Sequence, residues 1–239
     1  MIEKTADEAD TIDFGGSKPK DMGRLQSILF DLDGTLTDPK EGITKSVEYA
    51  LGKFNIAVEH LDELLSYIGP PLYDSFVEIQ GFTAENAQKA VEFYRERYAT
   101  LGKYENAVIP GIPQLLEELR GRGLDLYVAT SKPTVFAEDI LRHYGLDGFF
   151  KYVGGSNLDG TRSRKQEVIQ HVLDENHIPA NEALMIGDRE HDIIGAKACG
   201  LPSIGVMIGY GSEEELRSAG ADDIAYNVAE IGEIIYRLT

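Results

Sequence analysis

The stretch LQSILFDLDGTLTD, residues 25–38, places three aspartates directly after a short apolar run. The apolar residues at 28–30 predict a buried strand, and a buried strand ordinarily excludes unpaired charge because burying it is costly. Side chains two apart on a strand point to the same side, so Asp31 and Asp33 are expected to share a face at its carboxyl end. In open α/β sheets that end is where ligands bind. Asp38 lies farther along, and we assign it to a turn or hinge.

Three kinds of structure could explain the aspartate pair. An EF-hand loop needs glycine at its sixth position and an acid at its twelfth, but counting from Asp31 these places hold Leu36 and Gly42. A solvated turn would suit Asp33 and Gly34, yet it requires neither a preceding apolar strand nor a second acid in register. A catalytic or ion-binding pair of carboxylates uses both features, and Gly34 lets the backbone turn tightly beside a ligand.

Five further apolar runs follow, at residues 124–131, 151–156, 182–188, 202–209 and 223–228. Helical patterns accompany the later runs, at about residues 111–122, 133–144, 164–176 and 190–199. Strands that alternate with helices imply parallel pairing. The sequence therefore predicts an α/β fold with a doubly wound, Rossmann-like parallel sheet.

One segment breaks this alternation. From about residue 40 to 107 the pattern is helical only, and the Gly-Pro-Pro step at 69–71 is its only strong breaker. We therefore predict an α-helical domain inserted after the first strand. The expected division is a mobile N-terminal tail at 1–23, an α/β core domain at 24–38 and 109–239, and the helical domain at 39–108.

The composition restricts the class of partner. The 239 residues include 41 acidic and 23 basic ones, for a net charge of −18. A nucleic acid polymer and an anionic membrane surface both require basic patches, so neither is expected as a partner, whereas a small anion needs only a metal ion or a few lysines. Cys199 is the only cysteine, which excludes an internal disulfide and favours a reducing compartment. Because no apolar run has membrane-spanning length and no signal-peptide pattern begins the chain, we expect a cytoplasmic protein.

The stretch LYVATSKP, residues 126–133, predicts a strand that ends in polar residues. Thr130 and the backbone N–H groups of Ser131 and Lys132 would face an anion there. Pro133 suits the first position of the next helix, whose N-terminus favours negative charge. Taken alone, this stretch is better explained by Thr130 and Ser131 capping that helix.

The stretch TRSRKQEVIQ, residues 161–170, places Lys165 near the start of a helix. The apolar stripe that begins at Val168 defines the buried face of this helix, and Lys165 lies next to it. A single lysine is ordinarily solvated, and Arg162 and Arg164 are neighbouring cations. The residues alone do not choose among the three.

A second acidic pair occurs in MIGDREHD, residues 185–192. A predicted strand delivers Asp188 to the same sheet edge as Asp31, and Gly187 permits close approach. Asp192 follows four residues later, which returns it to the same side on a first helical turn. Carboxylate and carbonyl oxygens suit Mg²⁺, although a helix-capping role for Asp188 is reasonable in isolation.

These motifs together resemble the haloacid dehalogenase-like (HAD) superfamily of aspartate-dependent phosphotransferases. DLDGTLTD matches the family pattern DxDGT followed by a hydrophobic residue, any residue and Asp, and the later stretches match its Thr/Ser strand end, its lysine and its acidic motif, in that order. The inserted helical segment is similar to the family's cap. GPPL at 69–72 and TSKP at 130–133 look most like the phosphoglycolate phosphatase-like branch, which includes sequences labelled 5′-nucleotidases. The second aspartate, Asp33, argues against the dehalogenase branch.

The resemblance implies a Mg²⁺-dependent phosphatase acting on a small phosphorylated metabolite. In such an enzyme Asp31 attacks phosphorus and forms an aspartyl phosphate, while Asp33 protonates the leaving oxygen and later deprotonates the hydrolytic water. The metal ligands implied are Asp31, the backbone carbonyl of Asp33, Asp188 and Asp192. The groups implied to hold the phosphoryl oxygens are Thr130, Ser131, Lys165 and Gly34, with Thr130 and Lys165 also counted as catalytic.

Two other functions stay open. A phosphotransferase such as a sugar-phosphate mutase would isomerise its substrate without net release of phosphate. A catalytically idle scaffold would turn over no phosphoester, although the presence of every expected catalytic residue counts against it. The motifs specify neither the natural phosphoester nor the oligomeric state.

Overall fold

The computed structural model describes residues 24–239, so the predicted N-terminal tail at 1–23 lies outside the described residues. Its centre is a six-stranded parallel sheet in the order β5-β4-β1-β6-β7-β8. The strands are β1 (Ser27–Phe30), β4 (Asp125–Pro133), β5 (Tyr152–Ser156), β6 (Ala183–Gly187), β7 (Ser203–Val206) and β8 (Asp223–Ala225).

The chain reverses direction across the sheet at β1. It first adds β4 and β5 on one side of β1, and then adds β6, β7 and β8 on the other. This is the strand order of a Rossmann-like fold, in which ligands bind outside the carboxyl ends of the strands at the point of reversal. The predicted doubly wound α/β fold is confirmed, and its point of reversal lies between β1 and β6.

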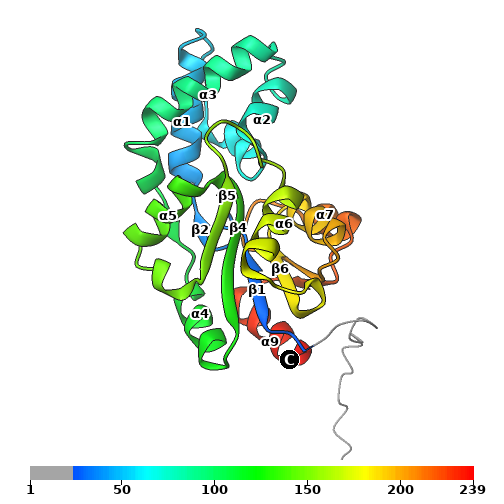
Figure 1. The fold of residues 1–239 in the computed structure, drawn as a ribbon. Helices are drawn as coiled ribbons and strands as arrows, with labels where there is room; N and C mark the ends of the chain where they lie inside the picture. Colours follow the sequence, from blue (N-terminus) through cyan, green and yellow to red (C-terminus); the bar gives the residue numbers. More distant parts are fainter. Residues whose placement is uncertain (1–23) are drawn as a thin grey trace, which may run out of the picture.

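Helices cover both faces of the sheet (Figure 1). Alternation along β1 sends Ile28 and Phe30 to one face, with α4, α5 and α9, and Leu29 to the other, with α6 and α7. Full burial of a side chain such as Phe30 stabilises the fold by roughly 1.5–3 kcal/mol. The core helices are α4 (Ile112–Gly121), α5 (Thr134–His143), α6 (Lys165–Asn176), α7 (Glu190–Ala198), α8 (Glu213–Ala219) and α9 (Val228–Leu238).

A separate group of helices stands above the carboxyl end of the sheet (Figure 1). It consists of α1 (Lys40–Gly52), the 3₁₀ helix η1 (Leu61–Tyr67), α2 (Leu72–Glu78) and α3 (Ala84–Tyr98), and we call it the helical cap. The cap has its own apolar core, to which the sheet domain adds Phe136 from α5. The short strands β2 (Thr37–Asp38) and β3 (Ala107–Val108) pair antiparallel, so the two connections to the cap run side by side.

The predicted elements differ from the observed ones in a few places. Within the segment predicted to be helical, Leu61–Tyr67 form the 3₁₀ helix η1 instead of an α-helix, and the sequence pattern did not indicate α8 or α9. Pro133 was expected to begin the helix that follows β4. It instead keeps an extended backbone at the end of β4, with φ −54° and ψ 131°, and α5 begins at Thr134. Short 3₁₀ helices η2 (Gly102–Tyr104), η3 (Asp147–Phe149) and η4 (Ala180–Glu182) complete the described elements.

Across residues 24–239, no helix combines the length and apolar character that a membrane span requires.

Candidate active site

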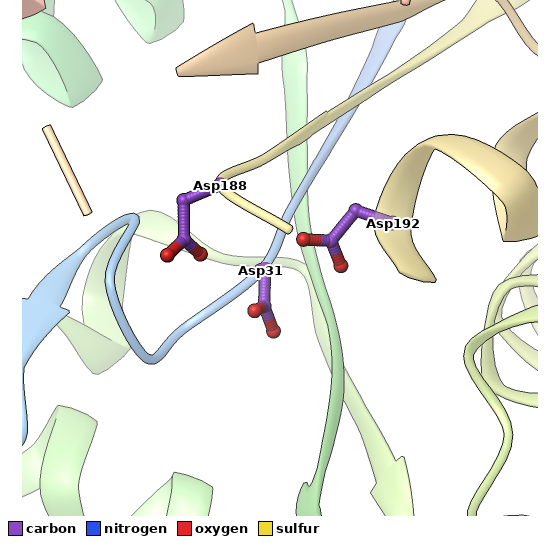
Figure 2. Close-up of side chains that lie close together, drawn as sticks. All are labelled: Asp31, Asp188 and Asp192. Carbon is purple, nitrogen blue, oxygen red and sulfur yellow. The ribbon is translucent and has the colours of Figure 1, made fainter. Parts of the chain in front are cut away.

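Three aspartates meet at the point where the sheet reverses direction (Figure 2). Asp31 follows β1 and Asp188 follows β6, two strands that pair in parallel, and Asp192 lies in the first turn of α7. One carboxylate oxygen from each residue lies within 4.8 Å of the other two, and all three side chains are buried. The structure therefore brings together the acids that two separate sequence motifs supplied.

Close backbone approach at Gly34 makes room for this acidic cluster. Gly34 has φ +81°, and a Cβ atom placed there would lie 2.2 Å from Asp188 Oδ2. A larger residue would therefore clash with the carboxylate and strain the backbone. The Asp188 carboxylate accepts hydrogen bonds from the hydroxyl of Thr35 (3.3 Å) and from the backbone N–H of Tyr210 (2.8 Å). Gly34 thus lets the loop after Asp33 pass close to the Asp188 carboxylate.

Lys165 is buried inside the acidic cluster and is not a solvated surface lysine. It is the first residue of α6, and its Nζ lies 2.7 Å from Asp31 Oδ1 and 2.7 Å from Asp192 Oδ1, while donating a hydrogen bond to the Ala129 carbonyl at 3.0 Å. Burial alone would lower the pKa of Lys165, but the adjacent carboxylates outweigh it and raise the pKa, which keeps this side chain charged.

One lysine does not balance three buried carboxylates. Asp31 Oδ1 and Asp192 Oδ1 receive no hydrogen bond of good geometry from the described residues, although Lys165 lies close to both. Burial raises the pKa of Asp188 well above its ordinary range and raises the pKa of Asp192 to about 6. An all-oxygen donor set with uncompensated charge fits a hard dication, so the residues present suit Mg²⁺.

Asp33 lies apart from the three clustered acids. Its carboxylate faces Lys132, whose Nζ donates to Asp33 Oδ1 at 2.5 Å, and both side chains are buried. Burial raises the pKa of Asp33, and the ammonium of Lys132 opposes that increase. The carboxylate of Asp33 therefore has its own cationic partner, separate from Lys165, and lies at the cavity wall.

Thr130 and Ser131 lie where the sequence placed them, at the carboxyl end of β4 beside β1. Thr130 is buried, and its hydroxyl accepts a hydrogen bond from the backbone N–H of Lys132 at 3.3 Å. Ser131 lines the cavity described below. Because β4 continues to Pro133, the alternative role of capping α5 is not seen for either hydroxyl.

A cavity of about 440 Å³ lies between the helical cap and the sheet edge. The sheet domain lines it with Asp33, Ser131 and Lys132. The cap contributes the GPPL turn at 69–72, together with several aromatic residues and Arg95. The aromatic lining residues are Tyr67, Tyr73, Tyr94 and Tyr98 from the cap and Phe136 from α5.

Sequence reasoning missed three residues at this site. The side chain of Lys132 was not singled out within TSKP, although it pairs with Asp33. Arg189 lies between the two acids of GDREHD and donates to the Ile68 carbonyl of the cap at 2.6 Å and to Glu215 at 2.8 Å. Tyr210 donates its hydroxyl to Asp38 beside the hinge, in addition to its backbone contact with Asp188.

Comparison with known proteins agrees with this arrangement. The profile of the haloacid dehalogenase-like hydrolase family matches residues 28–206, which include the four aspartates and Lys165. The chain belongs to this family. The resemblance inferred from the motifs is thereby confirmed.

Two relatives and one solved structure show how similar this chain is to other proteins. A 5′-nucleotidase of Pseudomonas aeruginosa is 50% identical over 212 residues, covering 89% of this chain and 96% of that protein. A tyrosine-protein kinase, PtkA of Mycobacterium tuberculosis, is 38% identical over 186 residues, covering 78% of this chain and 63% of that protein. A crystal structure described as a predicted phosphatase from Clostridium acetobutylicum superposes with a TM-score of 0.89 at 48% identity, covering 90% of this chain and all of that one. The 5′-nucleotidase belongs with the branch that the GPPL and TSKP stretches indicated.

Proposed function

We propose that this phosphatase hydrolyses a small phosphorylated metabolite with the help of Mg²⁺, by way of an aspartyl phosphate on Asp31. The observation that carries the proposal is the group of three buried carboxylates within 4.8 Å of one another, with Lys165 Nζ 2.7 Å from two of them. Family membership and the 5′-nucleotidase relative support a phosphatase.

Asp31 is the proposed nucleophile because it is central to the site. One of its oxygens lies beside Lys165, and its backbone is fixed by β1, where its N–H donates to the Ile186 carbonyl at 2.9 Å. In the first step an Asp31 oxygen forms a bond to phosphorus and the bond to the leaving oxygen breaks. Lys165 offsets part of the negative charge that repels an incoming phosphate.

Asp33 takes part in both steps by transferring a proton in each. It donates the proton to the leaving oxygen, which departs as an alcohol, and then accepts a proton from the water that attacks phosphorus. The second attack breaks the bond between Asp31 and phosphorus and releases inorganic phosphate. Splitting the reaction in two lowers the barrier of a reaction that is very slow in water.

Mg²⁺ would be held by the carboxylates of Asp31, Asp188 and Asp192 and by the backbone carbonyl of Asp33. When bound, it would supply positive charge that reduces repulsion between the acids and the phosphate. Thr130, Ser131 and the Gly34 backbone are the proposed neutral contacts to the phosphoryl oxygens, together with Lys165. The helical cap, residues 39–108, is the proposed domain that selects the rest of the substrate.

Phosphate release from a panel of esters tests this function. We expect net release of inorganic phosphate from nucleoside 5′-monophosphates or other small phosphomonoesters with Mg²⁺, and its loss when EDTA removes the metal. Isomerised sugar phosphate without release would instead indicate a mutase. Absence of turnover of every ester in the panel would favour an idle scaffold.

A further inference from the structure

Lys132 is a buried lysine to which the proposed function gives no role. Only 8% of its surface is exposed, and its Nζ donates to Asp33 Oδ1 at 2.5 Å. Burying an ammonium is costly unless a counter-charge and hydrogen bonds compensate it. Asp33 supplies that counter-charge across a sequence separation of 99 residues, so the contact is a product of the fold.

The surroundings of Lys132 fix the direction from which it reaches Asp33. Its ammonium lies 5.2 Å from the centre of the Tyr98 ring, which belongs to cap helix α3. The ring of Tyr98 is held in turn by stacking on Tyr94, at 4.9 Å, and by an edge contact with Phe136, at 5.6 Å. An aromatic face attracts a cation, so Lys132 is confined between Asp33 of the core and Tyr98 of the cap.

The two buried lysines of the site serve different acids. Lys165 contacts Asp31 and Asp192, whereas Lys132 contacts Asp33. Lys132 engages Oδ1 of Asp33, and Asp33 lines the cavity, so Oδ2 is the oxygen left for a leaving group there. The nucleophile and the proton donor therefore have separate cationic neighbours.

We propose that Lys132 is a positioning residue for proton transfer by Asp33, an inference that rests on the proposed function of Asp33. Lys132 holds Oδ1 so that Oδ2 delivers its proton to the leaving oxygen as the bond to phosphorus breaks. The electron pair left on the Asp33 carboxylate is then stabilised by the adjacent ammonium. Lys132 itself neither gains nor loses a proton in this step.

Two phosphate esters of similar shape distinguish a role of Lys132 in proton transfer from an effect that does not depend on the leaving group. Phenyl phosphate needs a proton on its leaving oxygen more than p-nitrophenyl phosphate does, because nitrophenolate is the better leaving group. The measured quantity is kcat/KM, which covers only the steps up to release of the alcohol. Since general acid catalysis contributes about 10²- to 10⁴-fold, we expect Lys132→Met to reduce kcat/KM for phenyl phosphate at least tenfold more than for p-nitrophenyl phosphate.

Matched variants make the test specific. Lys165→Met should reduce kcat/KM for both esters alike, because Lys165 serves the nucleophile. Lys132→Arg should restore part of the loss, and Asp33→Asn should show the same ester preference as Lys132→Met. The double variant Asp33→Asn/Lys132→Met should lose no more on phenyl phosphate than Asp33→Asn alone, since Lys132 acts through Asp33.

Equal losses on the two esters, or losses that multiply in the double variant, would overturn the positioning role. If Lys132→Met does not fold, as judged by circular dichroism and Tm, Lys132→Gln is used with the same criteria. Failure of the wild-type protein to release phosphate from either ester with Mg²⁺ would instead contradict the proposed function itself.

Discussion

The two sides of the cavity are built from different chemistry. The sheet side lines the cavity with Asp33, which is paired with Lys132, and the buried cluster of Asp31, Asp188, Asp192 and Lys165 lies at the same sheet edge outside the cavity lining. The cap side presents Tyr67, Tyr94 and Tyr98. On the proposed function, this difference means that the reacting groups belong to the rigid sheet edge, whereas the cap would supply shape and exclusion of water. Substitutions on the sheet side should therefore affect turnover most, and those on the cap side should affect substrate binding and stability.

The largest effect is expected at Asp31. Asp31→Asn removes the attacking carboxylate, so phosphate release should fall by at least about 10³-fold while the thermal transition stays cooperative. Asp38→Asn is the matched control from the same motif, because Asp38 lies outside the acidic cluster and accepts hydrogen bonds from the Lys40 N–H at 3.0 Å and from the Tyr210 hydroxyl. It should retain most of the activity. Turnover by Asp31→Asn would remove this residue as the nucleophile.

A smaller effect is expected at Asp188. Asp188→Asn removes one carboxylate from the proposed metal site, so the Mg²⁺ concentration for half-maximal activity should rise by roughly tenfold or more. Titration of phosphate release with Mg²⁺ measures it, and Asp147→Asn, at an exposed position of η3, provides the control. An unchanged Mg²⁺ dependence would exclude Asp188 from the metal site.

A still smaller effect is expected where the helical cap contacts the sheet domain. Arg189 donates to the Ile68 carbonyl of the cap, and Glu215 holds its guanidinium. Arg189→Met should weaken this contact and raise KM several-fold, since a hydrogen bond to a charged group contributes about 1.5–3 kcal/mol net. Glu215→Gln, which keeps one acceptor oxygen, should change KM less. A pure fall in kcat, with KM unchanged, would show that Arg189 serves the acids and not the cap.

The smallest effect concerns the stability of the cap at high pH. Burial raises the pKa of Tyr67 to about 12 from its ordinary 10. The unfolded chain loses this proton from about pH 10, whereas the folded chain keeps it until about pH 12, so the free energy of unfolding should fall as pH rises above about 10. Urea unfolding at several alkaline pH values should show a smaller fall in Tyr67→Phe. Tyr73→Phe, at an exposed position, should follow the wild type; equal curves for all three proteins would refute this assignment.

The sequence predicted the sheet side of the site well because periodicity determines where strands and helices end. Asp31 and Asp188 each follow a strand, so parallel pairing was enough to predict that they share one edge, whereas Lys165 was preferred over Arg162 and Arg164 only through the family resemblance. The sequence could not predict the partners of Lys132 and Arg189. Their contacts with Asp33 and Ile68 span 99 and 121 residues, and the contact with Ile68 also depends on how the cap docks.

The helical cap was predicted as a helical insertion but not in detail. Its segments lack strands and are rich in helix formers, so the class of structure followed from the pattern. The short η1 and α2 are decided by packing around Phe76 and Tyr67, because helices of seven residues have little stability of their own. The cavity lining consequently could not be derived from spacing along the chain.

The most direct test of the central claim is to trap the phosphoryl group during turnover. Borohydride added to the protein while it hydrolyses p-nitrophenyl phosphate with Mg²⁺ would reduce an aspartyl phosphate to homoserine, which peptide mass spectrometry locates. The account predicts homoserine at position 31 and none at Asp33 or Asp38. Homoserine at another position, or an unmodified residue 31 in protein trapped during sustained turnover, would contradict it.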